Sequence, residues 1–242
     1  MGRLSARSAP GVNAAARQSD GHVATGWGAT CDPTHMSQIL ERARYQLSAH
    51  NARQLPPDIG SEVAFAGRSN AGKSSALNAL TRQNALARVS KTPGRTQQLV
   101  FFQVTPEAHL VDLPGYGYAK VPQDLQAHWQ AFIDSYFRTR DALKGLVVVM
   151  DIRHPLKDYD RQMLAYAVQR GLPAHALLTK ADKLGRGQQM QTLAKVKKEL
   201  ASAFGDSVSV QCFSGESKQG VDEARLVIGG WLGLNPPAAP QG

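Results

Sequence analysis

The sequence has few cysteines and no long apolar run. Its two cysteines, Cys31 and Cys212, have no partner at the spacing of a metal site, so neither a metal cluster nor a disulfide framework is expected. Few cysteines also fit a reducing cytoplasm. The longest strongly apolar run, "LVVVM" at 146–150, is far too short to span a membrane. We therefore expect a soluble globular protein without a membrane span.

Acidic residues are missing from one long stretch. None lies between Glu62 and Glu107, whereas six basic residues do: Arg68, Lys73, Arg82, Arg88, Lys91 and Arg95. The whole chain carries a formal net charge of +9. Such a surplus favours a polyanionic partner, RNA in particular. A basic surface that only maintains solubility is the alternative.

The two ends of the chain differ from its middle. Residues 1–35 are rich in alanine and glycine, lack apolar periodicity and are predicted to be disordered. They contain no continuous apolar segment typical of a secretory signal. Three arginines precede the first acid, Asp20, so an organelle address is one interpretation, and an extension upstream of a start at Met36 is another. The proline-rich residues 235–242 are predicted to form a flexible tail.

A helical lead-in is predicted over 36–60, with four apolar residues on one face, Ile39, Leu40, Ala43 and Leu47. From 61 to 234, short apolar strands alternate with helices. Six strands are expected, ending near Gly67, Val104, Asp112, Asp151, Thr179 and Phe213. This alternation predicts a mostly parallel sheet with helices on both faces. Ligands of such folds bind beyond the carboxyl ends of the strands.

The stretch "GRSNAGKSS" follows the first of these strands. Gly67, Gly72, Lys73 and Ser74 fit the phosphate-loop pattern G-x-x-x-x-G-K-[ST]. Backbone N–H groups of this loop and of the following helix would surround phosphate oxygens. Lys73 would reach the β- and γ-phosphates, and the Ser74 hydroxyl would bind Mg²⁺. The other members of the predicted nucleotide-binding loop are Arg68, Ser69, Asn70, Ala71 and Ser75.

The stretch "VDLPG" ends a later strand. Asp112 stands where the acid that contacts Mg²⁺ through water is expected. Leu113 and Pro114 lead to Gly115, whose N–H would bond the γ-phosphate because no side chain blocks the approach. An ordinary turn is the alternative for this short pattern taken alone.

Two further motifs predict that the base of the bound nucleotide is guanine. In "TKAD", Thr179 to Asp182, the carboxylate would accept hydrogen bonds from N1–H and N2–H₂ of guanine, a donor pair that adenine lacks. Lys180 and Ala181 lie between them, and the stem of Lys180 would lie on the base. In "FSG", Phe213 to Gly215, Ser214 and nearby N–H groups would contact the guanine oxygen. Thr179 replaces the commoner Asn, and Gly215 replaces the commoner Ala.

A polar basic loop separates the first helix of this region from the strand "LVFFQV". It holds Thr92 and Thr96, of which Thr96 is predicted to close over Mg²⁺ and the γ-phosphate when GTP binds. Its neighbours Gly94 and Arg95 complete the predicted GTP-binding set. An ordinary basic loop is the alternative.

In this order, "GRSNAGKSS", "SKTPGRTQ", "VDLPGYGYAK", "TKADK" and "FS" resemble the EngB/YsxC/YihA GTPases. The resemblance covers about Ser37 to Leu234. It implies a P-loop NTPase domain of the translation-factor class over 61–234, with three α/β/α layers. It also implies a monomeric bacterial GTPase with Mg²⁺ as cofactor, which serves assembly of the large ribosomal subunit by contacting ribosomal RNA and protein. A need in septation follows as a secondary effect.

The position after "DLPG" holds Tyr116, where many GTPases have a Gln that orients water. Slow intrinsic turnover is therefore expected. Asn70, which the loop pattern does not require, is predicted to help hold a K⁺ ion that stimulates hydrolysis; an Asn that only caps loop groups is the alternative. The predicted catalytic set is Lys73, Asn70, Thr96 and Gly115.

Two other functions stay open: a nucleotide-binding scaffold at the division site with little hydrolysis, and an enzyme that transfers phosphate from GTP to a small substrate.

Overall fold

The computed structural model describes residues 33–87, 98–116 and 123–234. The predictions for residues 1–32 and for the tail at 235–242 lie outside these ranges.

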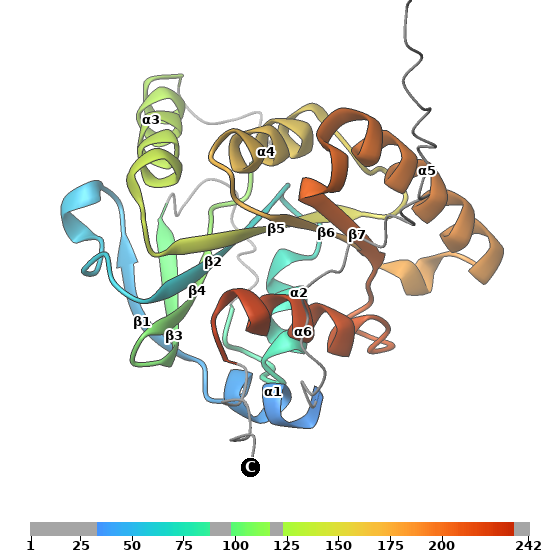
Figure 1. The fold of residues 1–242 in the computed structure, drawn as a ribbon, viewed down its shortest axis with the longest axis horizontal. Helices are drawn as coiled ribbons and strands as arrows, with labels where there is room; N and C mark the ends of the chain where they lie inside the picture. Colours follow the sequence, from blue (N-terminus) through green and yellow to red (C-terminus); the bar gives the residue numbers. More distant parts are fainter. Residues whose placement is uncertain (1–32, 88–97, 117–122, 235–242) are drawn as a thin grey trace, which may run out of the picture. The chain divides into compact units, whose positions relative to one another are not determined.

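A seven-stranded sheet forms the centre of the described part, in the order β1-β3-β4-β2-β5-β6-β7 (Figure 1). Neighbours from β4 to β7 pair in parallel, whereas β3 is antiparallel to both β4 and β1. The strands are β1 (Arg44–Ala49), β2 (Ser61–Gly67), β3 (Leu99–Thr105), β4 (Ala108–Asp112), β5 (Leu143–Asp151), β6 (Ala174–Thr179) and β7 (Val208–Cys212). The mostly parallel sheet is confirmed, with one strand more than predicted.

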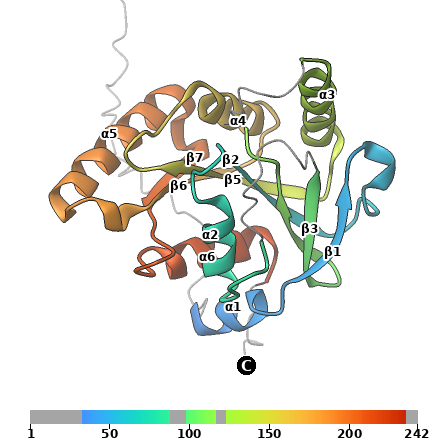
Figure 2. The same cartoon turned by 180° about the vertical axis from the view of Figure 1, so that it is seen from behind.

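Helices cover both faces of this sheet, as Figures 1 and 2 show. On one face lie α3 (Gln123–Thr139), α4 (Asp158–Gln169) and α5 (Arg186–Phe204); on the other lie α1 (Pro33–Leu40), α2 (Lys73–Leu80) and α6 (Val221–Trp231). Two hydrophobic clusters fill the spaces between sheet and helices. In β5, Leu146 and Val148 belong to one cluster and Val147 and Val149 to the other, because successive residues of a strand point to opposite faces. The three-layer α/β/α fold is therefore confirmed.

No helix of the described ranges is both long and apolar enough to cross a membrane.

The predicted helical lead-in over 36–60 is wrong for most of its length. Helix α1 already begins at Pro33, inside the segment predicted to be disordered, and ends at Leu40. Strand β1 then starts at Arg44, and its Leu47 pairs with Phe101 of β3. The apolar spacing of Leu40 and Leu47 fits a helix, but the two side chains pack on opposite faces of the sheet. The open edge of β3 supplies backbone hydrogen bonds to β1 and overrides the local pattern.

The predicted motifs all follow the carboxyl ends of strands, at the same edge of the sheet. Strands β2, β4, β5 and β6 end in Gly67, Asp112, Asp151 and Thr179, respectively. Because these strands are parallel, their carboxyl ends meet at the same edge. The phosphate-loop, "DLPG" and "TKAD" segments are thereby brought together at the position that ligands occupy in such folds.

Candidate functional site

The phosphate loop connects β2 to α2 in a conformation that requires glycine at two positions. A Cβ on Gly67 would lie 2.7 Å from the carbonyl oxygen of Val149 on the neighbouring strand. Gly72 precedes the first residue of α2 at φ 94°, a left-handed conformation that costs other residues energy. Asn70 is also left-handed, at φ 63°. Sharp turns at Asn70 and Gly72 carry the chain from the sheet edge to the helix N-terminus, where backbone N–H groups favour an anion.

Lys73 and Asp112 meet at this loop. The Lys73 ammonium group donates to the Asp112 carboxylate, and the two side chains are only 10% and 17% exposed. Asp112 ends β4, directly beside Phe65 of β2. The two residues predicted to act on phosphate and on the metal are therefore neighbours.

The residues present fit a Mg²⁺ ion. The carboxylate of Asp112 already accepts a cation, the ammonium group of Lys73, and Ser74 follows Lys73 in the first turn of α2. A hydroxyl and a carboxylate are the hard oxygen ligands that Mg²⁺ prefers, with phosphates and water completing its shell. Ser74 and Asp112 are thus the groups that would hold the ion.

The "DLPG" segment lies against the phosphate loop. The N–H of Ser69 donates to the carbonyl oxygen of Tyr116 at 3.0 Å, and the N–H of Tyr116 donates to the carbonyl oxygen of Gly67 at 3.4 Å. A Cβ on Gly115 would lie 3.3 Å from the nitrogen of Ser69. Gly115 therefore packs closely against the backbone of the loop, and its contact with a γ-phosphate stays a prediction.

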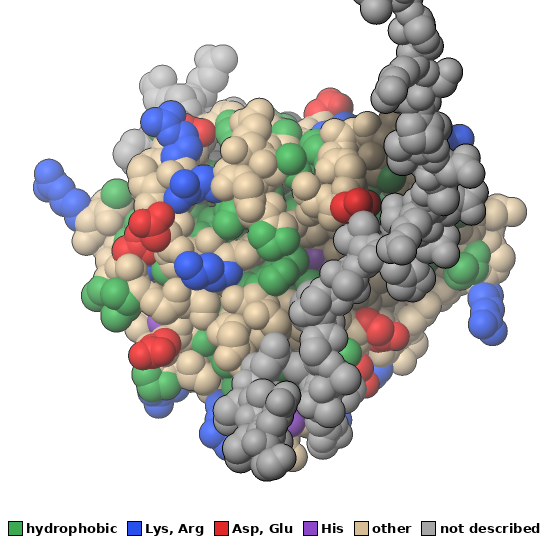
Figure 3. Space-filling model, in the orientation of Figure 1, with side chains coloured by type: hydrophobic (Ala, Val, Ile, Leu, Met, Phe, Trp, Pro, Cys, Tyr) green, Lys and Arg blue, Asp and Glu red, His purple; other side chains and the backbone are tan. Residues whose placement is uncertain are grey.

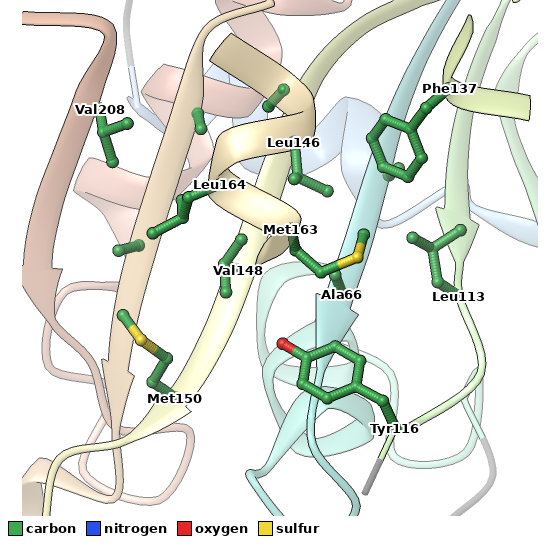
Figure 4. Packing of buried hydrophobic residues seen from close by; sticks show 14 of the residues in the cluster. Ala66, Leu113, Tyr116, Phe137, Leu146, Val148, Met150, Met163, Leu164 and Val208 are labelled. Carbon is green, nitrogen blue, oxygen red and sulfur yellow. The ribbon is translucent and has the colours of Figure 1, made fainter. Parts of the chain in front are cut away.

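The side chain of Tyr116 points away from the loop. Its hydroxyl donates to Asp160 of α4 at 2.8 Å, and Figure 4 shows its ring next to Met163 among buried side chains. Burial, followed by the charge of Asp160, raises the pKa of Tyr116 well above its ordinary value. Burial also raises the pKa of Asp160. Tyr116 therefore serves packing between the loop and α4, and its hydroxyl is not directed toward a nucleotide.

The "TKAD" and "FSG" segments form a second loop cluster beside the first. Ala181 N–H donates to the carbonyl oxygen of Phe213 at 3.1 Å, and the buried hydroxyl of Ser214 donates to Asp182 at 2.6 Å. Lys183 contacts the second carboxylate oxygen of Asp182 at 2.8 Å. Lys183 first, and Ser214 second, hold the pKa of Asp182 below its ordinary value. The low pKa favours the ionised carboxylate, and Ser214 orients it; the contact of Asp182 with guanine stays a prediction.

Thr179 ties the two loop clusters together. Its hydroxyl, on a residue only 3% exposed, lies 2.5 Å from the carbonyl oxygen of Ala71 and 2.9 Å from that of Met150. A hydroxyl has one proton and can donate to only one of them at a time. The commoner Asn has two N–H donors and could serve both, so the Thr keeps the contact to the phosphate loop with one donor fewer.

Lys180 makes a second tie. It adopts φ 57°, and its ammonium group donates to the carbonyl oxygen of Asn70 at 2.7 Å. The same group contacts Asp151, the last residue of β5, at 3.0 Å. Arg153 also bonds Asp151, at 2.6 Å, and is the first cause of its lowered pKa. Asp151 was not among the predicted site residues. Its position at the end of a buried strand, like that of Asp112, could have indicated that it lies at the site.

The unusual Gly215 has a steric reason. A Cβ there would lie 3.1 Å from the carbonyl oxygen of Ser75 and 3.4 Å from the Cβ of Ala79, both on α2. An alanine would require α2 to shift by a few tenths of an ångström. Gly215 lets the base-side loop approach the helix that follows the phosphate loop.

Part of the predicted site lies outside the described residues. Gly94, Arg95 and Thr96 belong to the undescribed segment 88–97, as do Arg88, Lys91 and Thr92. The roles given to them stay predictions.

Comparisons with known proteins agree with this geometry. A family model described as "50S ribosome-binding GTPase" matches residues 62–180. A relative named "Probable GTP-binding protein EngB" from Stenotrophomonas maltophilia is 88% identical over 199 residues, which cover 82% of this chain and 100% of the relative. One of the same name from Xanthomonas axonopodis pv. citri is 83% identical, covering 84% of this chain and 96% of the relative.

Solved structures share the fold at low sequence identity. The crystal structure of an EngB protein superposes with a TM-score of 0.58 at 18% identity, covering 72% of this chain and all of that chain. The structure of Era in complex with MgGDPNP and a segment of 16S ribosomal RNA superposes with a TM-score of 0.53 at 18% identity, covering 76% and 59%.

Proposed function

Because the chain belongs to the EngB family of GTP-binding proteins, we propose that it is a GTP-hydrolysing switch that assists assembly of the large ribosomal subunit. The observation that carries the proposal is the junction of the two loop clusters. Thr179 and Lys180 of the base-reading segment bond directly to Ala71 and Asn70 of the phosphate loop. One guanine nucleotide can therefore contact both clusters.

Nucleotide binding begins with a change of partner at Lys73. Its ammonium group bonds Asp112 and must turn to the β- and γ-phosphates when the nucleotide enters. Ser74 and Asp112 would then hold Mg²⁺, which neutralises charge on the phosphates. Asp182 reads the guanine edge, and Lys183 must share or release that carboxylate. The Gly115 N–H meets the γ-phosphate, which makes its segment sensitive to hydrolysis.

Hydrolysis proceeds without a side chain from position 116. The hydroxyl of Tyr116 is bonded to Asp160, so another group must position the attacking water and intrinsic turnover is slow. Asn70 stands exposed at a left-handed turn of the phosphate loop. We assign it a share in holding K⁺, whose charge would stabilise the transition state. Thr96 would close over the ion and the γ-phosphate from the neighbouring loop.

The partner proposed is the large subunit or its precursor, bound through RNA and protein in the bacterial cytoplasm by a monomer. Its support is the family description, which names 50S binding, together with a net charge of +9. The related fold of Era is known in complex with ribosomal RNA. A septation defect on loss of the protein follows from too few ribosomes.

Sedimentation with purified ribosomal particles tests this function. The protein should move with large subunits or their precursors in the presence of a non-hydrolysable GTP analogue and stay in the supernatant with GDP. Absence from every particle fraction at low salt, with any nucleotide, would overturn the proposal. It would leave the alternative of a nucleotide-binding scaffold at the division site.

A further inference from the structure

A pocket of about 210 Å³ lies at the far edge of the sheet from the nucleotide site. Its lining comes from the start of β1 and the end of β3: Arg42, Arg44, Gln103, Val104, Thr105 and Pro106. Because β3 runs antiparallel to β4, its end at Thr105 lies where the parallel strands begin. No motif of the nucleotide site contributes to this pocket.

The two arginines of the pocket have no carboxylate partner among the described residues. Arg44 donates from Nη2 and Nε to the neutral amide oxygen of Gln103, at 2.9 and 3.3 Å. No hydrogen bond or ion pair of the Arg42 side chain occurs within the described ranges, and both arginines are exposed. The sequence contains no acid from Arg42 to Pro57. Two arginines thus line one pocket, and neither forms an ion pair within the described residues.

The size and chemistry of the pocket suit a phosphate group. Its volume is below the roughly 300–1,000 Å³ of pockets that enclose a whole small ligand. Guanidinium groups bind phosphate oxygens through paired, charge-assisted hydrogen bonds. A single phosphodiester of a longer chain therefore fits this pocket better than a free nucleotide does.

An exposed aromatic side chain lies on the opposite face of β1 from Arg44, because successive residues of a strand point to opposite faces. Tyr45 follows Arg44 in β1 and is 60% exposed. Its hydroxyl lies 3.2 Å from that of Ser48, which holds the ring at the surface. A base of single-stranded RNA can stack on such a ring, and every base has a suitable face.

Net charge alone would not point to this edge. On the face drawn in Figure 3, basic and acidic side chains are interspersed. What distinguishes the edge is the combination of a pocket, two guanidinium groups without a carboxylate partner among the described residues, and an exposed tyrosine. We propose that this surface, named here the β1 edge and formed by Arg42, Arg44, Tyr45 and the pocket, binds a single-stranded segment of RNA. One backbone phosphate enters the pocket, the RNA crosses the outer side of the edge strand β1, and a neighbouring base stacks on Tyr45 on the other face. The inference rests on the proposed function, because ribosomal RNA would supply the segment.

The test compares two charge-matched double variants of the full chain. Arg42→Gln/Arg44→Gln removes the pocket charges, and Arg186→Gln/Lys195→Gln removes two exposed charges from α5. Binding is measured to large subunits and to protein-free large-subunit RNA over a range of salt concentrations. The first variant should bind subunits and free RNA at least tenfold more weakly. The slope of log binding constant against log salt concentration should become shallower by about 0.7, because one phosphate contact is lost. The α5 variant should stay within about twofold of the unchanged protein. Tyr45→Leu should weaken RNA binding about fivefold or more because it removes the ring, whereas Tyr45→Phe keeps the ring and should not weaken it.

Guanine nucleotide affinity, measured in parallel, should be equal in all variants and reports that they are folded. Equal weakening by the two double variants would overturn the inference and leave the proposed function standing. Weaker binding to subunits with unchanged binding to free RNA would also overturn it, because the edge would then face a ribosomal protein. If the unchanged protein binds no subunit, the proposed function fails, but selective loss of RNA binding by the pocket variant would still support the β1 edge.

Discussion

Replacing Thr179 by valine should weaken guanine nucleotide binding about tenfold. Valine keeps the shape of threonine but removes the hydroxyl that lies 2.5 Å from the carbonyl oxygen of Ala71. A buried carbonyl left without its donor costs about 1–3 kcal/mol, or about 5- to 150-fold in an equilibrium constant. Without this tie, the phosphate loop spends less time in the binding conformation, and the apparent affinity falls by that fraction. Titration with a fluorescent GDP analogue measures the affinity, and denaturant unfolding measures the accompanying loss of stability.

Thr179→Asn is the matched control. Its two N–H donors can serve the carbonyl oxygens of Ala71 and Met150 together, so it should bind at least as tightly as the unchanged protein. A valine variant that is folded and binds GDP within twofold of the unchanged protein would show that the hydrogen bond from Thr179 to Ala71 does not support nucleotide binding. An asparagine variant as weak as the valine variant would show that the pocket's shape, and not the hydrogen bond, sets the affinity.

Four further predictions follow from the same site. Asp182→Asn should shift preference from guanine to xanthine nucleotides, because the donor pattern at the base edge is inverted; unchanged GTP affinity would remove Asp182 from base reading. Lys73→Ala should abolish tight binding of GTP and GDP, and retained nanomolar or micromolar affinity in the same titration would contradict its role. Hydrolysis should be faster in K⁺ than in Na⁺ buffer and should lose that difference in Asn70→Ala, whereas equal turnover in both buffers would refute the K⁺ proposal. Tyr116→Phe should lower the free energy of unfolding by about 1–3 kcal/mol with nucleotide affinity kept. Losing the donor raises the pKa of Asp160 further above its ordinary value, so this loss should grow as pH rises through the raised pKa of Asp160, and a pH-independent loss would contradict the role of this hydrogen bond.

The sheet and its motifs were predictable because local and tertiary signals agree there. The run from Leu146 to Met150 is apolar at every position, as a strand buried on both faces must be. Gly72 marks a left-handed turn that other residues adopt only with strain, and Gly67 lies where a Cβ would clash with the neighbouring strand. These signals depend on the residue itself and its near neighbours, so the sequence alone reveals them.

Strand β1 was not predictable in the same way. The spacing of Leu40 and Leu47 is compatible with a helix, and only the open edge of β3 decides for a strand. The ties from Thr179 to Ala71 and from Tyr116 to Asp160 join residues far apart in the chain. Their partners are a backbone carbonyl and a carboxylate, for which no sequence pattern exists. Long-range hydrogen bonds of this kind require the fold to be known first.

The most direct test of the proposed switch is the affinity of the protein for a GTP analogue and for GDP, with and without large ribosomal subunits. If the chain is a switch that engages the subunit in its GTP form, the subunit must tighten the GTP analogue relative to GDP, because coupling between two ligands is reciprocal. The affinity for the GTP analogue should rise about fivefold or more relative to that for GDP, within the usual range of such coupling. Identical ratios of the two affinities with and without subunits would contradict a switch of this kind.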